Sequence, residues 1–468
     1  MCQADLPLEM IPALLDLGRA LGEHVRKHRD ASLEVHEQGL LDAVRQVAPP
    51  LLEALVSRAT SGLAADGRPV RARCPSCQQR RPAQSRRKRQ LQTRVGAISV
   101  ERPWHHCQPC GHGWSPSDQA LGLAAYQQTS SGLARWEALL GAITTFGEAS
   151  MLLAEFAGVH VGTETLRVQA ERVGTELEGQ QRAAMQHVEA QHEPLPSESD
   201  PAPGRLVVET DGVMVRYRDR HLDGTRIEED DWHEVKLGVV GGWLGQRPRA
   251  ELQAASYVAA REPARAFARR LGTEAARRGA LDVTEWHPWD GTPAQLRPVV
   301  VLGDGAKWIW QEIGPLFGPE RTEIVDYFHA TEHVWTVAKA LHGHDTPEST
   351  AWAEAGVHRL WRHGPQALLG WFDAALARTS DAAAVLKRER SYFSTNAPRM
   401  RYPELRRSSL PIGSGAVEST AKHLVQQRMK RAGMRWSDLG ARAILDLRCH
   451  LLSGRSLAPV RSSPTKFG

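Results

Sequence analysis

The sequence lacks any long apolar run. Within its 468 residues no stretch reaches the roughly 18 uncharged apolar residues that a membrane-spanning helix needs. The first ten residues, MCQADLPLEM, have neither the basic start nor the apolar core of a secretory signal. We therefore expect a cytoplasmic protein with no membrane partner. With 41% apolar residues, the chain is long enough to bury more than one core.

Cysteine is also scarce, which excludes a disulfide-built scaffold. Of the six cysteines, four form two pairs with two residues between the members, Cys74 with Cys77 and Cys107 with Cys110. Two such pairs favour one tetrahedral Zn²⁺ site with no open position, so the ion would be structural; redox pairs and reduced surface thiols are the alternatives. Three nearby histidines offer substitutes for a cysteine ligand: His105, His106 and His112.

Acidic residues are nearly absent from two stretches. Between Arg68 and Arg102 there are eleven Lys or Arg and one acid, Glu101, or +10, against +5 for the whole chain. Such an imbalance favours a polyanionic partner, here double-stranded DNA. In the first stretch the expected phosphate contacts are Arg86, Arg87, Lys88 and Arg89. In the second, the expected contacts on one helix are Lys422, Arg428, Lys430, Arg431 and Arg435.

Composition and periodicity divide the chain into six regions. We expect a helical N-terminal region (1–70), a four-cysteine zinc module with a basic loop (71–116), a second helical region (117–190), a linker (191–204), a catalytic domain (205–435) and a C-terminal helix and tail (436–468). In the second helical region, a turn at Gly158 and a helix start near Thr163 or Thr165 are compatible with a DNA-reading helix-turn-helix and equally with a helical hairpin.

The catalytic region has the pattern of a mixed α/β domain. RLVVETDGVMVRY, WHEVKLGVVGGW and ELQAASYVAA predict three successive strands, followed by a helix from about residue 263 to 278. RPVVVLGDGAKWIW and TEIVDYFHATEHVWTVAKAL each predict a strand that runs into a helix. Polar residues at the ends of these strands should therefore face a common edge.

Three acidic residues occupy noteworthy positions, two of them in or at the end of an apolar strand and one at the start of a helix. Asp211 lies within the first predicted strand and Asp304 ends the fourth; each is followed by glycine, although Asp-Gly is also a common turn pair. Glu418 begins a helix after a Gly-Ser-Gly hinge. Converging carboxylates repel each other unless divalent cations neutralise them, and oxygen ligands favour Mg²⁺ or Mn²⁺. Two such ions, about 3.5–4 Å apart, would support in-line displacement at phosphorus.

The segment VDYFHATEHV raises a competing interpretation. His329-x-x-Glu332-His333 has the spacing with which inverzincin peptidases hold zinc and a general base on one helix. A peptidase would need a third ligand downstream, and nothing in the sequence ties Glu404 or Glu418 to that task. The motif alone is therefore a weak indication of peptidase activity.

Taken in order, these motifs resemble those of bacterial insertion-sequence DDE transposases of the ISKra group, with a distant similarity to Mutator-type transposases. The resemblance covers most of the chain. It rests on the cysteine pairs flanking a basic stretch, on ETDGVMV, VVLGDGAKWIW and DYFHATEHVW, and on LPIGSGAVESTAKHLVQQRMKRAGMRWSDLGARAILDL. The last block is very specific.

The resemblance implies an RNase H-like core with an all-helical insertion at about 331–405, in which Asp211, Asp304 and Glu418 are the catalytic triad that holds two Mg²⁺ ions. Glu209 and Asp219 lie on or near the same strand as Asp211 and are alternatives for its position in the triad.

Two further catalytic residues follow from the resemblance. Asp326-x-x-His329 matches the Asp/Cys-x-x-His signature of Mutator-type enzymes. His329 would then belong to the catalytic site of a transposase, and His333 and Glu332 would face the helical insertion or solvent.

The activity implied is binding of the terminal inverted repeats, hydrolysis at the element's ends and strand transfer, by a nucleoid-associated bacterial protein that is at least dimeric when the ends are synapsed. Three alternatives remain: a zinc-dependent DNA-binding protein with a dead nuclease, a structure-selective nuclease that cuts without joining, and the inverzincin-like peptidase.

Overall fold

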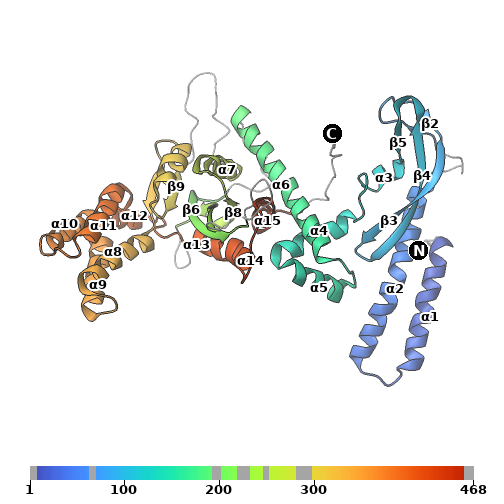
Figure 1. Cartoon of the computed structure of the whole chain (residues 1–468), viewed down its shortest axis with the longest axis horizontal. Coiled ribbons are helices and arrows are strands. Elements are labelled where there is room, and N and C mark those ends of the chain that lie inside the picture. Colours follow the sequence, from blue (N-terminus) through green and yellow to red (C-terminus); the bar gives the residue numbers. More distant parts are fainter. Residues whose placement is uncertain are drawn as a thin grey trace. The chain divides into compact units, whose positions relative to one another are not determined.

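A computed structural model describes residues 8–62, 70–191, 202–218, 232–245, 252–280 and 298–457. It is a mixed α/β structure that forms two compact units (Figure 1). The first contains the described residues up to Ala170, together with Leu457, and the second spans Glu171–Ser456. Within these ranges no helix combines the length and the apolar character needed to cross a bilayer.

The first unit begins with a helical hairpin. After a short 3₁₀ turn (η1, Leu8–Met10), α1 (Ile11–Lys27) and α2 (Leu33–Thr60) pack against each other. The C-terminal half of α2 also packs against strand β4 (Gly96–Cys107). There the Glu53 carboxylate accepts a 2.5 Å hydrogen bond from the backbone N–H of Ser99. The helical region and the cysteine-containing strands therefore share one core.

Two small sheets follow the hairpin. β1 (Ala72–Arg73) and β2 (Arg80–Arg81) pair antiparallel, and β3 (Ala83–Thr93), β4 and β5 (His112–Trp114) form an antiparallel meander. Alternation along β3 and β4 buries Leu91, Ile98 and Val100, and Leu52 and Val56 of α2 pack on this cluster. A short helix, α3 (Pro116–Ala120), packs against β4.

Three helices complete this unit and lead into the next: α4 (Ser131–Ile143), α5 (Phe146–Ala157) and α6 (Thr163–Gln191). Thr145 and Glu148 form a capping box at the start of α5, and Gly158, with φ +64°, ends it in the left-handed conformation that glycine favours. The turn and the start of α6 lie where the sequence predicts them.

The boundary between the two units falls within α6, between Ala170 and Glu171, and residues 192–201 of the predicted linker lie outside the described ranges. The part of α6 after Ala170 belongs to the second unit because it packs against α15 (Asp438–Leu452). A side chain at Gly174 would come within 2.0 Å of the Ala443 carbonyl oxygen, so only glycine permits this approach. Arg442 also pairs with Glu178 at 3.3 Å.

The second unit is built on a five-stranded mixed sheet in the order β10-β9-β6-β7-β8. The strands are β6 (Arg205–Arg216), β7 (Trp232–Trp243), β8 (Gln253–Ala260), β9 (Val299–Gly303) and β10 (Thr322–Val325). β6, β7 and β8 form an antiparallel meander, while β9 runs parallel to β6 and β10 parallel to β9. All five strands occur where the sequence predicts them.

Helices cover both faces of this sheet (Figure 1). α7 (Ala264–Arg277) packs on one face, where a side chain at Gly238 of β7 would meet Leu271 at 2.6 Å. α13 (Gly415–Thr420) lies on the other face, where the Val417 N–H reaches Glu209 of β6. Thr210 is the register partner of Gly238, so the neighbouring Glu209 and Asp211 share the α13 face.

The helix predicted after β9 is present but short. A helical turn that begins at Lys307 continues as a π-helical turn (η4, Ile309–Ile313) and is followed by a 3₁₀ turn (η5, Gly314–Phe317). Pro315 lies at the start of the 3₁₀ turn, where no hydrogen bond from its nitrogen is needed. Because proline has no backbone N–H, it cannot continue the preceding helix.

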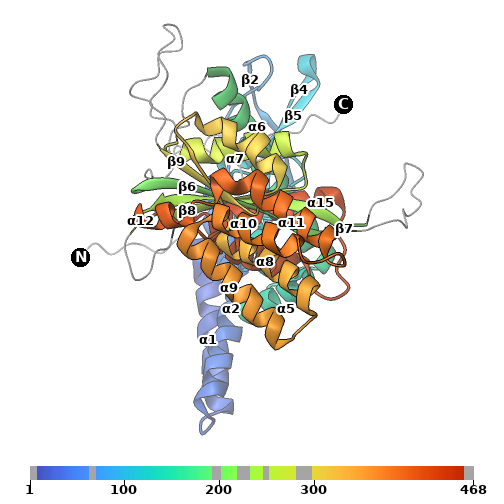
Figure 2. The same ribbon diagram turned by 90° about the vertical axis from the view of Figure 1, so that its left-hand side faces the viewer.

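Between β10 and α13 the chain is helical, with α8 (Tyr327–His342), α9 (Pro347–His363), α10 (Pro365–Leu376), α11 (Ala383–Asn396), the 3₁₀ turn η6 (Ala397–Arg399) and α12 (Tyr402–Arg407). α8 to α11 gather together in both views, coloured orange in Figure 2. Within them, the Trp352 and Trp371 rings stack with centroids 4.0 Å apart. After α13, a π-helical stretch (η7, Ala421–Gln426) and α14 (Gln427–Met429) continue the expected basic helix.

Candidate functional site

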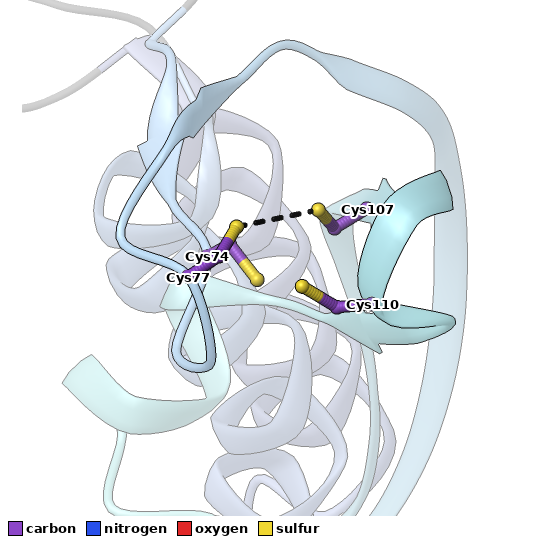
Figure 3. Close-up of side chains that lie close together, drawn as sticks. All are labelled: Cys74, Cys77, Cys107 and Cys110. Carbon is purple, nitrogen blue, oxygen red and sulfur yellow. Dashed lines mark hydrogen bonds between the residues drawn. The ribbon is translucent and has the colours of Figure 1, made fainter.

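The four paired cysteines form one cluster. Their sulfur atoms all lie within 4.8 Å of one another, and Cys77 and Cys107 are 3.6 Å apart. Figure 3 shows the four side chains converging from two separate turns. A tetrahedral zinc ion with Zn–S bonds of about 2.3 Å would hold its sulfur ligands about 3.8 Å apart. The cluster therefore has the size and the donor set of a zinc site.

Each cysteine pair lies at a tight turn between short antiparallel strands. In the first, the N–H of Cys74 donates to Gln79 O at 2.9 Å and the N–H of Gln78 donates to Cys74 O at 2.9 Å. In the second, Cys107 pairs with His112 across β4 and β5, and Gly111 has φ +63°. Two such turns placed face to face present four thiols to one point, as a tetrahedral zinc site requires.

Hydrogen bonding to one thiol favours the form that binds metal. The backbone N–H groups of Cys77 and Ser76 donate to the Cys74 sulfur and lower the pKa of this thiol to about 7, although the side chain is buried. A thiolate is the species that coordinates zinc. The effect is confined to Cys74, because hydrogen bonding to Cys77 and burial raise the pKa of the Cys110 thiol to about 12.

The nearby histidines do not join the cluster. His105 is buried, its Nδ1 lies 3.1 Å from the Arg81 carbonyl oxygen, and its ring stacks on Trp114. Among the described residues, the metal-binding group consists of cysteines alone. The ligand set left open by the sequence is therefore resolved in favour of the four cysteines over a histidine substitute.

In the second unit, acidic residues line one edge of the sheet. Thr210 of β6 and Val325 of β10 both pair with Gly303 of β9. The residue that follows each of these is an aspartate: Asp211 within β6, Asp304 directly after β9 and Asp326 directly after β10. Because the three strands are parallel, these residues lie side by side, level with the carboxyl ends of β9 and β10, which is the edge where α/β sheets place ligand sites.

Electrostatic contacts link this edge to Glu418 and His329. Burial raises the pKa of the Asp211 carboxyl, and the negative charges of Asp304 and Glu418 raise it further. The N–H of Gly212 and the charge of His329 act in the opposite direction. Asp304, Glu418 and His329, which are all predicted to be catalytic, therefore each lie within electrostatic reach of Asp211.

The carboxylates of Asp211, Asp304 and Glu418 do not converge closely enough to hold one metal ion together. Asp304 Oδ1 accepts a 2.9 Å hydrogen bond from the N–H of Ala306, and Glu418 is exposed on α13. In the described part of the chain, the four cysteines are the only group of three or more potential ligands close enough to hold one ion. The acidic edge offers suitable donors for Mg²⁺, but its side chains would have to turn inward to coordinate it.

The helical segment after β10 supplies partners that the sequence did not indicate. His333 Nδ1 lies 2.6 Å from Glu389 Oε2, and its Nε2 lies 3.3 Å from Nε2 of His329. Tyr392 stacks on the His333 ring, with centroids 3.8 Å apart, and donates a 2.9 Å hydrogen bond to the Asp304 carbonyl oxygen. α11 thus contacts both His333 and the end of β9.

Glu209 and Asp211, the two acids on β6, differ in their surroundings. Glu209, on the same face of β6, is only 2% exposed and its carboxyl is occupied by the N–H of Val417. Asp211 is more exposed and stands at the sheet edge next to Asp304. Asp219, the other alternative, lies outside the described residues.

The basic run on β3 divides into surface and structural residues. Arg86 pairs with Glu101 at 3.5 Å, while Arg87 and Lys88 line a hollow of about 1800 Å³. Arg89 differs, because its side chain is 9% exposed, contacts Asp118 at 3.3 Å and donates to two backbone carbonyls. This corrects the expectation that Arg89 contacts phosphate: it holds the β3–α3 packing together.

The basic residues after Glu418 divide in the same way. Lys422, Lys430 and Arg431 are exposed, and Arg435 is half-buried. Arg428 is 1% exposed, and its guanidinium lies 4.8 Å from the centre of the Trp436 ring. Arg428 therefore belongs to the core, which corrects its assignment as a phosphate contact.

No protein-family model matches this sequence, and no curated protein matches it either.

Proposed function

We propose that the protein is a DNA transposase that binds the ends of a bacterial insertion sequence and cuts and joins DNA with Asp211, Asp304 and Glu418. The observation that carries the proposal is the strand register that sets Asp211 beside Asp304, with Glu418 and His329 in electrostatic reach. The same residues carry the sequence resemblance to DDE transposases of the ISKra group.

The sheet supports an RNase H-like core. A three-stranded antiparallel meander followed by two parallel strands on the opposite side of β6 places the first and fourth strands next to each other. This adjacency is the condition under which the two aspartates predicted from the sequence can act together. The helices between β10 and α13 agree with an insertion before the glutamate.

The acidic edge accounts for the chemistry required. When bound there, Mg²⁺ or Mn²⁺ would activate the attacking water or 3′-hydroxyl and stabilise the leaving oxygen. Asp211, Asp304 and Glu418 would hold two such ions and orient the phosphodiester between them. His329, beside Asp211, is available to contact the scissile phosphate or to transfer a proton.

DNA binding would involve both units. On the first, Arg87 and Lys88 stand beside the exposed Tyr126 in the same hollow. On the second, Lys422, Lys430 and Arg431 extend the surface next to Glu418. These residues would position the duplex through its phosphates, and α5 and α6 are candidates for base readout. A dimer or larger assembly would synapse the two ends.

The geometry favours this function over a zinc peptidase. His329 and His333 are close, but in the described part of the chain no third ligand joins them. Glu332, which would be the general base, is 76% exposed at its side chain and 3.6 Å from His329 Nδ1. The histidine pair therefore lacks both the third ligand and a sheltered base.

Incubation with labelled DNA that carries the element's own end tests the proposal. Wild-type protein should nick and join this DNA in Mg²⁺ but not in EDTA, and Asp304→Asn should abolish both steps while DNA binding persists. Intact DNA under all conditions, with tight zinc-dependent binding, would instead identify a DNA-binding protein without nuclease activity. Cutting without joining would identify a nuclease.

The division of the basic run predicts different effects for neighbouring arginines. Replacing Arg87 and Lys88 together by alanine should weaken DNA binding and reduce the slope of log K against log salt by about 1.8, since each phosphate contact contributes about 0.9. Arg89→Ala should instead lower the thermal stability of the first unit, because Asp118 would lose a buried partner. Fluorescence anisotropy at several salt concentrations and thermal melting measure the two effects. An unchanged salt slope in the double variant would contradict the assignment.

A further inference from the structure

A buried carboxyl lies directly beneath the helix that carries Glu418. Glu209 is 2% exposed in the middle of β6, and its Oε2 accepts a 2.8 Å hydrogen bond from the backbone N–H of Val417. The N–H of Ala416 also donates to this carboxyl. Both donors belong to the first turn of α13, immediately before Glu418. Glu209 thus connects the central strand of the sheet to the beginning of this helix.

A second buried carboxyl holds the segment just before that helix. Asp326 is 1% exposed, and its Oδ1 caps α8 by accepting a 2.7 Å hydrogen bond from the N–H of His329. Its Oδ2 accepts hydrogen bonds from the N–H and the hydroxyl of Ser414, the latter at 2.5 Å. The N–H of Tyr327 also donates to the Ile412 carbonyl oxygen at 2.8 Å. Asp326 therefore hydrogen-bonds both to the start of α8 at His329 and to Ser414 of the Gly-Ser-Gly hinge.

A contribution to folding stability does not by itself explain why Glu209 and Asp326 are buried carboxyls. Burying a carboxyl is costly unless it is well paired, and an apolar side chain of similar volume is often equally stable or better. Gly413 and Gly415 on either side of Ser414 give the hinge conformational freedom that must be restricted if Glu418 is to be placed accurately. Backbone hydrogen bonds to fixed carboxyls supply that restriction.

We propose that Glu209 is a positioning residue for Glu418, with Asp326 as its companion. Glu209 stands two residues before Asp211 on the same face of β6, so one strand both carries one catalytic carboxylate and fixes the helix of another. Asp326 then acts through Ser414 and His329 and does not itself coordinate metal. This inference rests on the proposed transposase function and assigns roles within its active site.

Conservative and apolar replacements separate positioning from bulk stability. Glu209→Gln keeps an oxygen that can accept the Val417 N–H and should cleave DNA within about threefold of wild type. Glu209→Leu fills the space without an acceptor and should lower the cleavage rate at saturating DNA by about a hundredfold, as expected for a misplaced catalytic group. The DNA dissociation constant and the melting temperature should change little. Glu354→Leu, at an exposed position on α9, is the matched control.

Hydrogen exchange gives a readout that does not need activity. In Glu209→Leu, the amides of residues 413–424 should exchange about tenfold faster than in wild type, whereas Glu209→Gln should match wild type. Asp326→Asn should accelerate exchange in the same segment. This measurement tests the positioning role even if the wild-type protein cuts no DNA, in which case only the proposed function fails. Unchanged exchange in Glu209→Leu, or full cleavage activity in that variant, would overturn the inference.

Discussion

Glu418→Gln should reduce Mg²⁺-dependent DNA cleavage by about a thousandfold or more, because loss of one metal-binding carboxylate removes several kcal/mol of transition-state stabilisation. Glu418 is exposed, so the replacement should leave folding and DNA affinity nearly unchanged. Single-turnover cleavage of end DNA at saturating protein measures the chemical step. An electrophoretic shift assay on the same preparation measures binding.

Glu404→Gln is the control for this experiment. Glu404 lies on α12 and is exposed. Its carboxylate pairs with Arg401 at 3.2 Å. Its replacement should keep the cleavage rate within about twofold of wild type, as is usual for surface substitutions. If Glu418→Gln cleaved as fast as Glu404→Gln, the catalytic triad would need a different third member.

Cys107→Ser should remove most of the bound zinc and unfold the cysteine-bearing strands of the first unit. The side chain is buried, and structural zinc typically contributes about 10–16 kcal/mol of binding free energy to such small modules. Metal analysis should give one zinc per chain in the wild type and much less in the variant. DNA affinity should fall with it, since the neighbouring strand β3 carries Arg87 and Lys88.

Ser76→Ala is the matched control, because Ser76 is exposed in the first cysteine turn and contributes its backbone N–H, which alanine keeps. It should retain full zinc content. Chelation of wild-type protein should reproduce the behaviour of Cys107→Ser and be reversed by added Zn²⁺. Zinc content near one in Cys107→Ser would show that the metal binds elsewhere.

Much of the fold followed from local sequence patterns. Alternating or continuous apolar runs bounded by polar residues predicted all five strands of the large sheet, and the cysteine spacing predicted the cluster in the first unit. A carboxylate in an apolar strand is costly without a partner, and this marks Asp211 and Asp304 in the sequence. The two can act together only if β6 and β9 are neighbours, and they are.

The supporting residues of the site could not be predicted in the same way. Tyr392 and Glu389 lie on α11, more than fifty residues after His333, and only the packing of α11 against α8 brings them to the histidine. Glu209 offered a signal, as an acid in an apolar strand, but its engagement with Val417 joins positions 208 residues apart. Such contacts leave no periodicity in the sequence.

Charge runs also concealed a distinction that burial reveals. Arg86 to Arg89 look equivalent as letters, yet Arg87 is exposed whereas Arg89, on the same face of β3, lies where that face is covered and contacts Asp118 of α3. Arg428 likewise sits among exposed basic residues but packs on Trp436. A helix or strand with many basic residues and few acids therefore predicts a basic surface, but the sequence does not show which of the basic side chains face solvent.

Anomalous scattering from Mn²⁺ in a crystal of the protein bound to end DNA tests the central claim most directly. The account predicts two peaks about 3.5–4 Å apart at the sheet edge, ligated by Asp211, Asp304 and Glu418, with the Glu209–Val417 hydrogen bond intact. Loss of both peaks in Asp304→Asn would complete the assignment. A wild-type complex with no manganese at this edge, or with a single ion held by His329 and His333, would contradict it.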